Sequence, residues 1–323
     1  YVELQEAIAA GQLRGSVRIL PGISSVVSLA ALVGESYEDA AILSMHGKKL
    51  NHLPTTVVSH EKTFLLTSGS EDIRKIGRML TEMGLTDCEV IVGYQLSYPE
   101  ENIRILMPEQ CVEVTEEGLY TCLIRNPHPQ PELLTHGRAD TCFLRDASGT
   151  EGKLRRTPMT KEEVREVSIC KLHLTDGAVV YDIGSGTGSV AVEIAGLSET
   201  VHVYAVERKP EAVELLRKNR EHFHMDNMEI IEALAPEGLE ELPVPTHAFI
   251  GGSGGRLMDI LQTLYRKNPH MRIVINAISM ETIAELQEVL EAFPVEDGEI
   301  LQMQVNRVKK LGSYHLPQAE NPV

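Results

Sequence analysis

The first 126 residues alternate short apolar runs with segments whose apolar residues recur at helical spacing. Short apolar runs bounded by turn-forming residues are typical of β-strands. These runs lie at residues 17–20, 40–45, 63–66, 89–92 and 120–124. Helices are predicted at residues 24–33 and 70–83, and each opens on a serine that can cap its first turn. Strands that alternate with helices predict an α/β layer.

A proline-rich stretch interrupts this pattern at residues 126–131, where the sequence is Asn-Pro-His-Pro-Gln-Pro. Each proline fixes φ and removes a backbone donor, so three of them so close together favour an extended linker. From there to residue 156 the apolar residues show neither the period of a helix nor that of a strand. We therefore expect a first domain at residues 1–126, then a linker at residues 127–156 that includes an edge of the next domain.

From residue 157 onward the chain alternates strands and helices regularly. Strands are predicted at residues 179–183, 202–206, 229–231, 247–250, 272–276 and 299–306. Helices are predicted at residues 161–172, 189–195, 210–222, 256–265 and 281–290. Pro210 falls at a favourable first helical position. This order predicts a doubly wound, mostly parallel sheet over residues 157–323.

The strand at residues 179–183 leads into a glycine-rich turn, Gly-Ser-Gly-Thr-Gly, and then into a helix. Glycines let the backbone adopt positive φ and approach a ligand, while the helix start offers free N–H groups. Asp182 lies two residues before the first glycine. Its charge would repel the pyrophosphate of a dinucleotide but suits the ammonium group of a methionine moiety. The alternative is a turn whose glycines only allow tight packing.

The next predicted strand ends at Glu207, 25 positions after Asp182. A carboxylate at the end of the second strand can accept both hydroxyl groups of a ribose. A glycine-rich turn alone is weak support, but the turn, its spacing and the two acids together predict a site for S-adenosylmethionine. We therefore expect residues 157–323 to form a Rossmann-like class I methyltransferase domain.

Two further features mark the rim at which ligands of open α/β sheets bind. The strand at residues 247–250 is followed by Gly-Gly-Ser-Gly-Gly at residues 251–255, which suggests close backbone approach to something bulky or else a flexible turn. The next strand ends at Asn276. Ser279 is an equally good candidate for a simple helix cap.

Net charge and cysteine usage narrow the classes of protein that the chain can belong to. The net charge of −17 argues against a nucleic-acid substrate, because phosphate binding needs a basic face. The longest apolar stretch, residues 26–33, is too short to span a bilayer. Five cysteines without a CxxC pair suit reduced, mostly buried thiols in a cytoplasmic protein. No metal site is expected, since the histidines show no ligand spacing, and the start at Tyr1 suggests a fragment.

Several motifs in the second half resemble those of the decarboxylating C15-methyltransferases of cobalamin biosynthesis. They are Thr-Pro-Met-Thr-Lys-Glu-Glu-Val-Arg at 157–165, the turn Asp-Ile-Gly-Ser-Gly-Thr-Gly-Ser at 182–189, Ala-Pro at 235–236, Phe-Ile-Gly-Gly-Ser-Gly-Gly at 249–255 and Asn-Ala-Ile-Ser-Met-Glu-Thr at 276–282. Together with the turn and its acid, the resemblance implies the following cofactor-binding residues. They are Thr160, Asp182, Gly184, Ser185, Gly186, Thr187, Gly188, Glu207 and Ala235.

The first part is similar to the second lobe of a tetrapyrrole methylase. The similarity rests on Leu-Pro-Gly-Ile-Ser-Ser at 20–25, Ser-Met-His-Gly-Lys at 44–48 and Leu-Leu-Thr-Ser-Gly at 65–69. Both halves together resemble the fused precorrin-6Y C5,15-methyltransferases (decarboxylating). That family's opening lobe, with its Ser-Gly-Asp-Pro segment, is not found here, and neither is a last strand expected after residue 323. The resemblance thus implies C15 methylation with decarboxylation of the C12 acetate, and we expect the chain as given to lack C5 methylation.

The resemblance also implies a precorrin substrate, whose many carboxylates call for local cations. Arg155, Arg156, Lys161 and Arg165 cluster at the start of the second domain. They are candidates for this role, or else solvated charges on a helix face. The substrate candidates at the sheet rim are Gly251, Gly252, Ser253, Gly254, Gly255 and Asn276.

No covalent nucleophile is expected, because methyl transfer from a sulfonium is a direct displacement. The resemblance further implies a homo-oligomer without nucleic-acid or membrane partners. Two other functions remain open: an RNA or tRNA methyltransferase of the same fold, and a first domain that is only a structural module. Against the first of these, no Asn/Asp-Pro-Pro-Tyr/Phe segment follows the fourth strand of the second domain.

Overall fold

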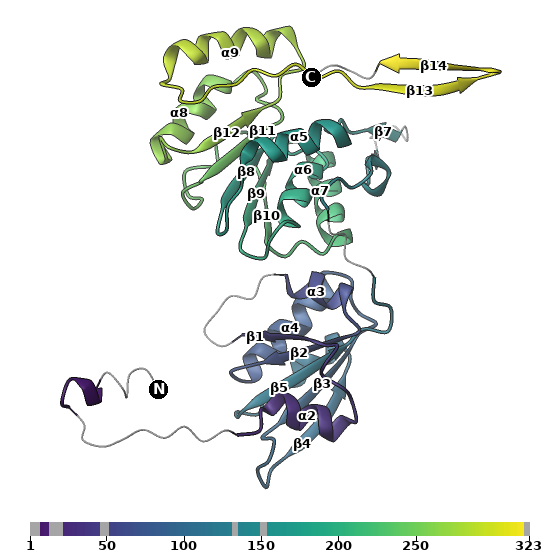
Figure 1. Ribbon diagram of the computed structural model, residues 1–323, viewed down its shortest axis with the longest axis vertical. Coiled ribbons are helices and arrows are strands. Elements are labelled where there is room, and N and C mark those ends of the chain that lie inside the picture. Colours follow the sequence, from purple (N-terminus) through teal and green to yellow (C-terminus); the bar gives the residue numbers. More distant parts are fainter. Residues whose placement is uncertain (1–6, 13–21, 46–51, 131–134, 149–153, 320–323) are drawn as a thin grey trace.

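The computed structural model describes residues 7–12, 22–45, 52–130, 135–148 and 154–319. It contains two five-stranded sheets, one in each part of the chain, and two short hairpins (Figure 1). The predicted strand at residues 17–20 lies outside the described residues. Within the described part, no helix is both long and apolar enough to cross a membrane.

The first sheet has the strand order β1-β2-β5-β3-β4. Its strands are β1 (Ala41–Ser44), β2 (Lys62–Leu66), β3 (Glu89–Tyr94), β4 (Asn102–Leu106) and β5 (Tyr120–Arg125). Only β1 and β2 run parallel, and the other neighbours are antiparallel. Successive residues of a strand point to opposite faces, so Phe64 packs beneath helix α2 (Ser25–Val33) while Leu65 packs with helices α3 (Leu53–Ser59) and α4 (Ser70–Glu82).

Four of the five strands predicted in this part are confirmed, within two residues at each end, as are both helices. The serine cap is correct for α2, where Ser24 accepts a hydrogen bond from the Val26 amide. It is wrong for α4, because Gly69 is the residue that precedes this helix and no side chain caps it. Helix α3, strand β4 and the 3₁₀ helix η1 (Pro108–Glu113) were not predicted.

The second sheet is fully parallel and has the order β10-β9-β8-β11-β12. Its strands are β8 (Val179–Ile183), β9 (His202–Glu207), β10 (Met228–Glu232), β11 (His247–Ile250) and β12 (Arg272–Ile275). These confirm five of the six predicted strands within one residue at each end. The central strands are apolar on both faces, as expected of a parallel sheet covered on both sides.

Helices pack on both faces of this sheet (Figure 1). They are α5 (Glu162–Leu172), α6 (Ser189–Ala195), α7 (Pro210–His222), α8 (Leu257–Lys267) and α9 (Met280–Ala292). One apolar cluster joins α5, α6 and α7 to Val180 and Val203, and the other joins α8 and α9 to Tyr181. Pro210 occupies the predicted first position of α7. Burial of apolar side chains on both faces is the main driving force for this fold.

Residues 135–148, predicted to be part of a linker, pack against the second sheet's helices. This stretch contains the 3₁₀ helix η2 (Asp140–Cys142) and strand β6 (Asp146–Ser148), which pairs with β7 (Leu154–Arg156). The Phe143 side chain is only 5% exposed and belongs to the apolar cluster of α5, α6 and α7. Residues 135–148 are therefore packed as part of the second domain and do not form a free linker.

The strand predicted at residues 299–306 is wrong in its position. The structure has no strand at residues 299–305, and β13 (Asn306–Leu311) begins where the prediction ended. It pairs only with β14 (Tyr314–Ala319), in an antiparallel hairpin that projects away from the second sheet (Figure 1). An ion pair of 2.6 Å between Arg307 and Glu163 of α5 links this hairpin to the domain.

Candidate functional site

The residues singled out by sequence meet at the carboxyl edge of the second sheet. Backbone hydrogen bonds between neighbouring strands bring them together: the Gly184 amide donates to the Val206 carbonyl over 3.0 Å, and the Gly251 amide donates to the Ile183 carbonyl over 2.9 Å. The Asn276 amide continues this row to the carbonyl of Ile250. The glycine turn after β8, Glu207 at the end of β9 and the glycine loop after β11 therefore form one rim.

Glu207 is held in a fixed orientation by backbone amides. Its Oε2 accepts from the Gly186 amide over 2.9 Å, and its Oε1 accepts from the amides of Arg208 and Lys209, each over 2.9 Å. Only 8% of the residue is exposed. A carboxylate has about four lone-pair positions, so three amides leave capacity for another donor. This geometry suits an acceptor for the hydroxyl groups of a ribose.

Asp182 lies beneath the turn rather than at its surface. It is 1% exposed, and the Ser185 hydroxyl donates to its Oδ2 over 2.6 Å. Its Oδ1 has no partner of good hydrogen-bond geometry among the described residues, and the Ala191 amide, which lies near the carboxyl, only lowers its pKa. A buried polar atom without a partner is rare and often marks a site that a ligand or an ordered water completes. The position therefore fits a cationic or hydrogen-bonding group.

Burial also affects the charge state of Asp182. It raises the pKa of this carboxyl from 3.8 to about 7, although the Ser185 hydroxyl opposes the shift. Because the pKa is higher in the folded state than in the unfolded state, the stabilisation that the protonated group gives below pH 4 is lost as the pH rises through 7. A cation bound near the carboxylate would favour its charged form.

The glycine turn packs tightly against the glycine loop. Gly184 has a φ of 73°, and a Cβ atom at this position would lie 2.5 Å from the Gly252 carbonyl oxygen. A Cβ on Gly186 would lie 3.3 Å from the Pro158 carbonyl oxygen. The glycine loop was expected to lie close to something bulky. At Gly252 this neighbour is the backbone of the glycine turn, at Gly184. At Gly252 and Gly254, in contrast, a Cβ atom would meet little or nothing within 4 Å, so the loop keeps open space there.

Other rim residues form contacts within the domain. Ser253 donates a 3.3 Å hydrogen bond to Glu285 of α9. The Asn276 Oδ1 accepts from the Ser168 hydroxyl of α5 over 3.2 Å. Ser279 caps α9 by accepting from the Thr282 amide, as its alternative interpretation predicted. Ala235 follows β10 and is 6% exposed.

Arg165 does not have the substrate-binding role that the sequence suggested. Its side chain is fully buried and its guanidinium is surrounded by partners within the protein, so it cannot reach a macrocycle. Lys161 remains partly exposed, with 37% of its side chain accessible, and forms an ion pair of 3.1 Å with Asp140. Arg155 and Arg156 lie in β7, and their side chains are outside the described part of the structure.

Three polar residues behind the rim were not predicted from the sequence: Asp140, Glu193 and Asn219. Glu193 and Asn219 are at most 3% exposed, and Asp140 has 20% of its side chain accessible. One signal was present, since Glu193 is the only charged residue in the otherwise apolar or small sequence of helix α6. A charge on such a helix either faces solvent or has buried partners.

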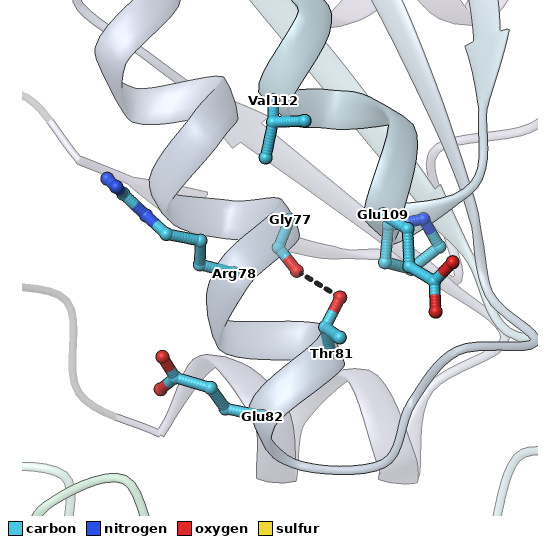
Figure 2. A pocket seen from close by; sticks show the side chains of 7 residues that line it. Gly77, Arg78, Thr81, Glu82, Glu109 and Val112 are labelled. Atoms are coloured by element: carbon cyan, nitrogen blue, oxygen red, sulfur yellow. Dashed lines mark hydrogen bonds between the residues drawn. The ribbon is translucent and has the colours of Figure 1, made fainter.

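Each part of the chain has a recess. One, of about 540 Å³, lies between residues 140–146, Lys161 and α7 of the second domain. The other, of about 280 Å³, lies between α4 and η1 of the first domain, where Thr81 donates to the Gly77 carbonyl and Arg78, Glu82 and Glu109 point outward (Figure 2). Among the described residues no group of three or more His, Cys, Asp or Glu side chains is arranged to hold a metal ion.

Comparisons with known proteins agree with this geometry. A family model described as a precorrin methyltransferase domain matches residues 155–323, and one described as tetrapyrrole (corrin/porphyrin) methylases matches residues 1–107. A cobalt-precorrin-6B C(15)-methyltransferase (decarboxylating) of Salmonella typhimurium is 33% identical over 51% of this chain and 86% of its own length. A precorrin-6Y C(5,15)-methyltransferase (decarboxylating) of Sinorhizobium is 24% identical over 92% of this chain and 69% of its own.

Solved structures give the same result. A precorrin-6y C5,15-methyltransferase of Geobacter metallireducens is 34% identical with a TM-score of 0.50, covering 59% of this chain and 95% of the other. A precorrin 8W decarboxylase of Methanobacterium thermoautotrophicum is 32% identical with a TM-score of 0.51, covering 57% and 95%. The chain therefore belongs to the precorrin methyltransferase family, with a Rossmann-like methyltransferase domain that follows a tetrapyrrole methylase segment.

Proposed function

We propose that residues 157–323 bind S-adenosylmethionine at the rim of the second sheet and transfer its methyl group to C15 of a precorrin. Decarboxylation of the C12 acetate accompanies the transfer, as a step of cobalamin biosynthesis. The observation that carries the proposal is the Glu207 carboxylate, which three amides orient beside the glycine turn. The names of the relatives, which specify C15 methylation with decarboxylation, support the substrate.

The residues present fit this donor in charge and shape. Glu207 would accept the ribose hydroxyl groups, and the partnerless Oδ1 of Asp182 would favour the ammonium of the methionine moiety. The turn leads directly into α6, which has no side-chain cap at its first residue. Thr160, Ser185, Thr187, Gly188 and Ala235 complete the proposed set of donor-site residues by resemblance. When bound, S-adenosylmethionine supplies a methyl group activated by its sulfonium.

The chain's part in the reaction is to position two reactants and exclude water. The open space over Gly252 and Gly254 leaves room for a flat acceptor next to the turn. Lys161 offers a positive charge for a carboxylate of the macrocycle, and the Asn276 side chain lies on the same rim. Loss of carbon dioxide from the acetate leaves an electron pair that the conjugated ring can accept before a proton is added.

C5 methylation of the same macrocycle is assigned to the tetrapyrrole methylase part. The support is the relative named for both positions, which matches 92% of this chain. The acidic net charge of −17 and the absence of an Asn/Asp-Pro-Pro-Tyr/Phe segment after β11 favour the macrocycle over RNA as the substrate. Five unpaired cysteines favour a cytoplasmic location.

We expect Glu207→Ala to weaken S-adenosylmethionine binding tenfold or more, which is about 1.4 kcal/mol or above. The variant removes the oriented acceptor for the ribose while leaving β9 in place. Titration calorimetry of the purified full chain measures the effect, and Glu211→Ala is the matched control, since this exposed acid is the second residue of α7 and lies four positions further along the chain. An unchanged affinity in a folded Glu207→Ala protein would remove the ribose assignment.

The homo-oligomer implied by resemblance has a candidate contact in the β13–β14 hairpin. Val308, Leu311, Tyr314 and Leu316 expose between 46% and 71% of their surface on it. An isolated two-stranded hairpin is marginally stable in water, and its unpaired edges favour pairing with another strand. We propose that a second copy of this chain covers the hairpin.

We expect Tyr314→Asp to shift the chain toward the monomer, because it would bury a charge in that contact. Light scattering at micromolar concentration measures the mass. The control is Val244→Asp, which changes a residue of similar exposure in a loop of the same domain. A wild-type chain that is monomeric under these conditions would contradict the proposed assembly.

A further inference from the structure

Three polar side chains with almost no exposed surface point at residues 136–146 from three different helices. They are Arg165 of α5, Glu193 of α6 and Asn219 of α7, which are 0%, 3% and 0% exposed. Burying a polar or charged group costs free energy unless it is hydrogen-bonded. Their partners therefore indicate what these three residues stabilise.

Glu193 and Arg165 hold the first part of the 136–146 segment. The carboxylate of Glu193 accepts from the backbone amides of Gly137 and Arg138, over 3.2 and 2.6 Å. The guanidinium of Arg165 donates to the Arg138 carbonyl and, over 3.3 Å, to Glu193. It also lies over the Phe143 ring, 4.8 Å from its centre. Charged hydrogen bonds of this kind fix a backbone more strongly than neutral ones.

Asn219 joins the same segment directly to the glycine turn. Its Oδ1 accepts from the Leu144 amide over 2.9 Å, and its Nδ2 donates to the Leu144 carbonyl over 3.1 Å. The same Nδ2 donates to the carbonyl of Thr187 over 2.8 Å. Thr187 lies within the turn, so one buried amide connects the segment with the rim.

Arg165 and Asp140 also hold the residues that lie over the turn. The Arg165 Nη1 donates to the Thr160 carbonyl over 2.8 Å. The Asp140 Oδ1 accepts from the Glu162 amide over 3.0 Å, and so caps α5 from outside the helix, which has no side-chain cap of its own. Just ahead of these residues, the Pro158 carbonyl lies 3.3 Å from the Cβ position of Gly186.

We propose that residues 136–146 are a positioning element of the methyl-donor site, with Arg165 and Asp140 as its positioning residues. The segment holds residues 158–161 in place over the glycine turn through Arg165 and Asp140. Through Asn219 it also holds the carbonyl of Thr187 within the turn. It lies outside residues 155–323, which the precorrin methyltransferase model matches. The proposal rests on the proposed function, since it takes the turn as the donor site.

Asp140 is the residue that tests this role with least risk to the fold. Its side chain is 20% exposed, and Arg165 keeps Glu193 as a partner when Asp140 is removed. Asp140→Ala removes the cap of α5 and the bond to Arg165. Asp140→Asn is the conservative variant, because its amide oxygen can still accept from Glu162 and Arg165 while the ion pair with Lys161 is lost. Glu211→Ala is the control, because this exposed acid of α7 lies outside the segment.

The full chain of each variant is titrated with S-adenosylmethionine by calorimetry, and hydrogen exchange is followed by mass spectrometry. Asp140→Ala should bind the donor at least tenfold more weakly, with faster exchange confined to residues 157–162 and 184–188. Asp140→Asn and Glu211→Ala should bind within twofold of the wild type. Rescue by the asparagine and local exchange together distinguish positioning from a general loss of stability.

Three results would overturn the proposal. One is wild-type affinity in Asp140→Ala while Glu207→Ala still binds weakly, which leaves the donor site in place and removes the positioning role. Another is faster exchange throughout β8–β12 in Asp140→Ala, which indicates general destabilisation. The third is equal loss of affinity in Asp140→Ala and Asp140→Asn. If Glu207→Ala also binds normally, the proposed donor site itself fails.

Discussion

Arg165→Ala should lower the free energy of unfolding of the second domain by about 3–5 kcal/mol. The guanidinium is fully buried, and its loss leaves Glu193 as a buried carboxylate without its counter-charge. The Thr160 and Arg138 carbonyls lose a donor at the same time. An uncompensated buried charge costs far more than the loss of a surface ion pair.

Urea unfolding with pulsed hydrogen exchange measures this effect on peptides of β8 to β12 alone, separately from the first domain. The matched control is Arg217→Ala, which breaks an exposed 3.1 Å pair with Glu232 and should change the free energy by about 1 kcal/mol or less. An Arg165→Ala protein as stable as this control would show that the buried cluster contributes little.

Gly184→Ala should reduce the affinity for S-adenosylmethionine tenfold or more and also destabilise the second domain. Its Cβ would lie 2.5 Å from the Gly252 oxygen and 2.8 Å from the Gly252 nitrogen. These are backbone atoms, so the turn and the loop must move apart for the methyl group to fit. The positive φ adds a strain of about 1–2 kcal/mol for any residue with a Cβ.

Gly177→Ala separates these two causes. Gly177 has a φ of 72°, nearly the same as Gly184, but nothing lies within 4 Å of its Cβ position. It precedes β8, at the opposite edge of the sheet, so its variant should lose stability from strain and keep the donor affinity of the wild type. Calorimetry on both variants tests this, and equal donor affinity in Gly184→Ala and Gly177→Ala would contradict the close approach as a feature of the site.

The second domain was predictable because its strands are continuous apolar runs that alternate with amphipathic helices. The secondary-structure prediction failed where contacts distant in sequence, rather than the local pattern of residues, determine the structure. Helix α3 contains a proline, four β-branched residues and a serine, all of which have poor helix propensity, and its stability comes from packing of Leu53 and Val57. Residues 299–306 alternate like a strand, but a strand also requires a neighbour, and only residues from Asn306 onward have one.

The rim residues were predictable because strand order alone brings strand ends to one edge. The role of Arg165 was not, because its partners lie far away in the sequence. Glu193 lies 28 positions after Arg165 in the sequence, and Asp140 lies 25 positions before Arg165. In the sequence, the arginine follows a lysine and two glutamates, which is typical of a solvated helix face. Only the folded structure shows that this face is covered by residues 136–146.

The central claim is that the rim of the second sheet holds S-adenosylmethionine against a precorrin. The most direct test is mass spectrometry of the product made by the full chain from a purified precorrin substrate and methyl-labelled S-adenosylmethionine, with Glu207→Ala in parallel. We expect a product that has gained a labelled methyl group at C15 and lost carbon dioxide, with much less of it from Glu207→Ala. A substrate recovered without either change, from a folded chain that binds the donor, would contradict the central claim.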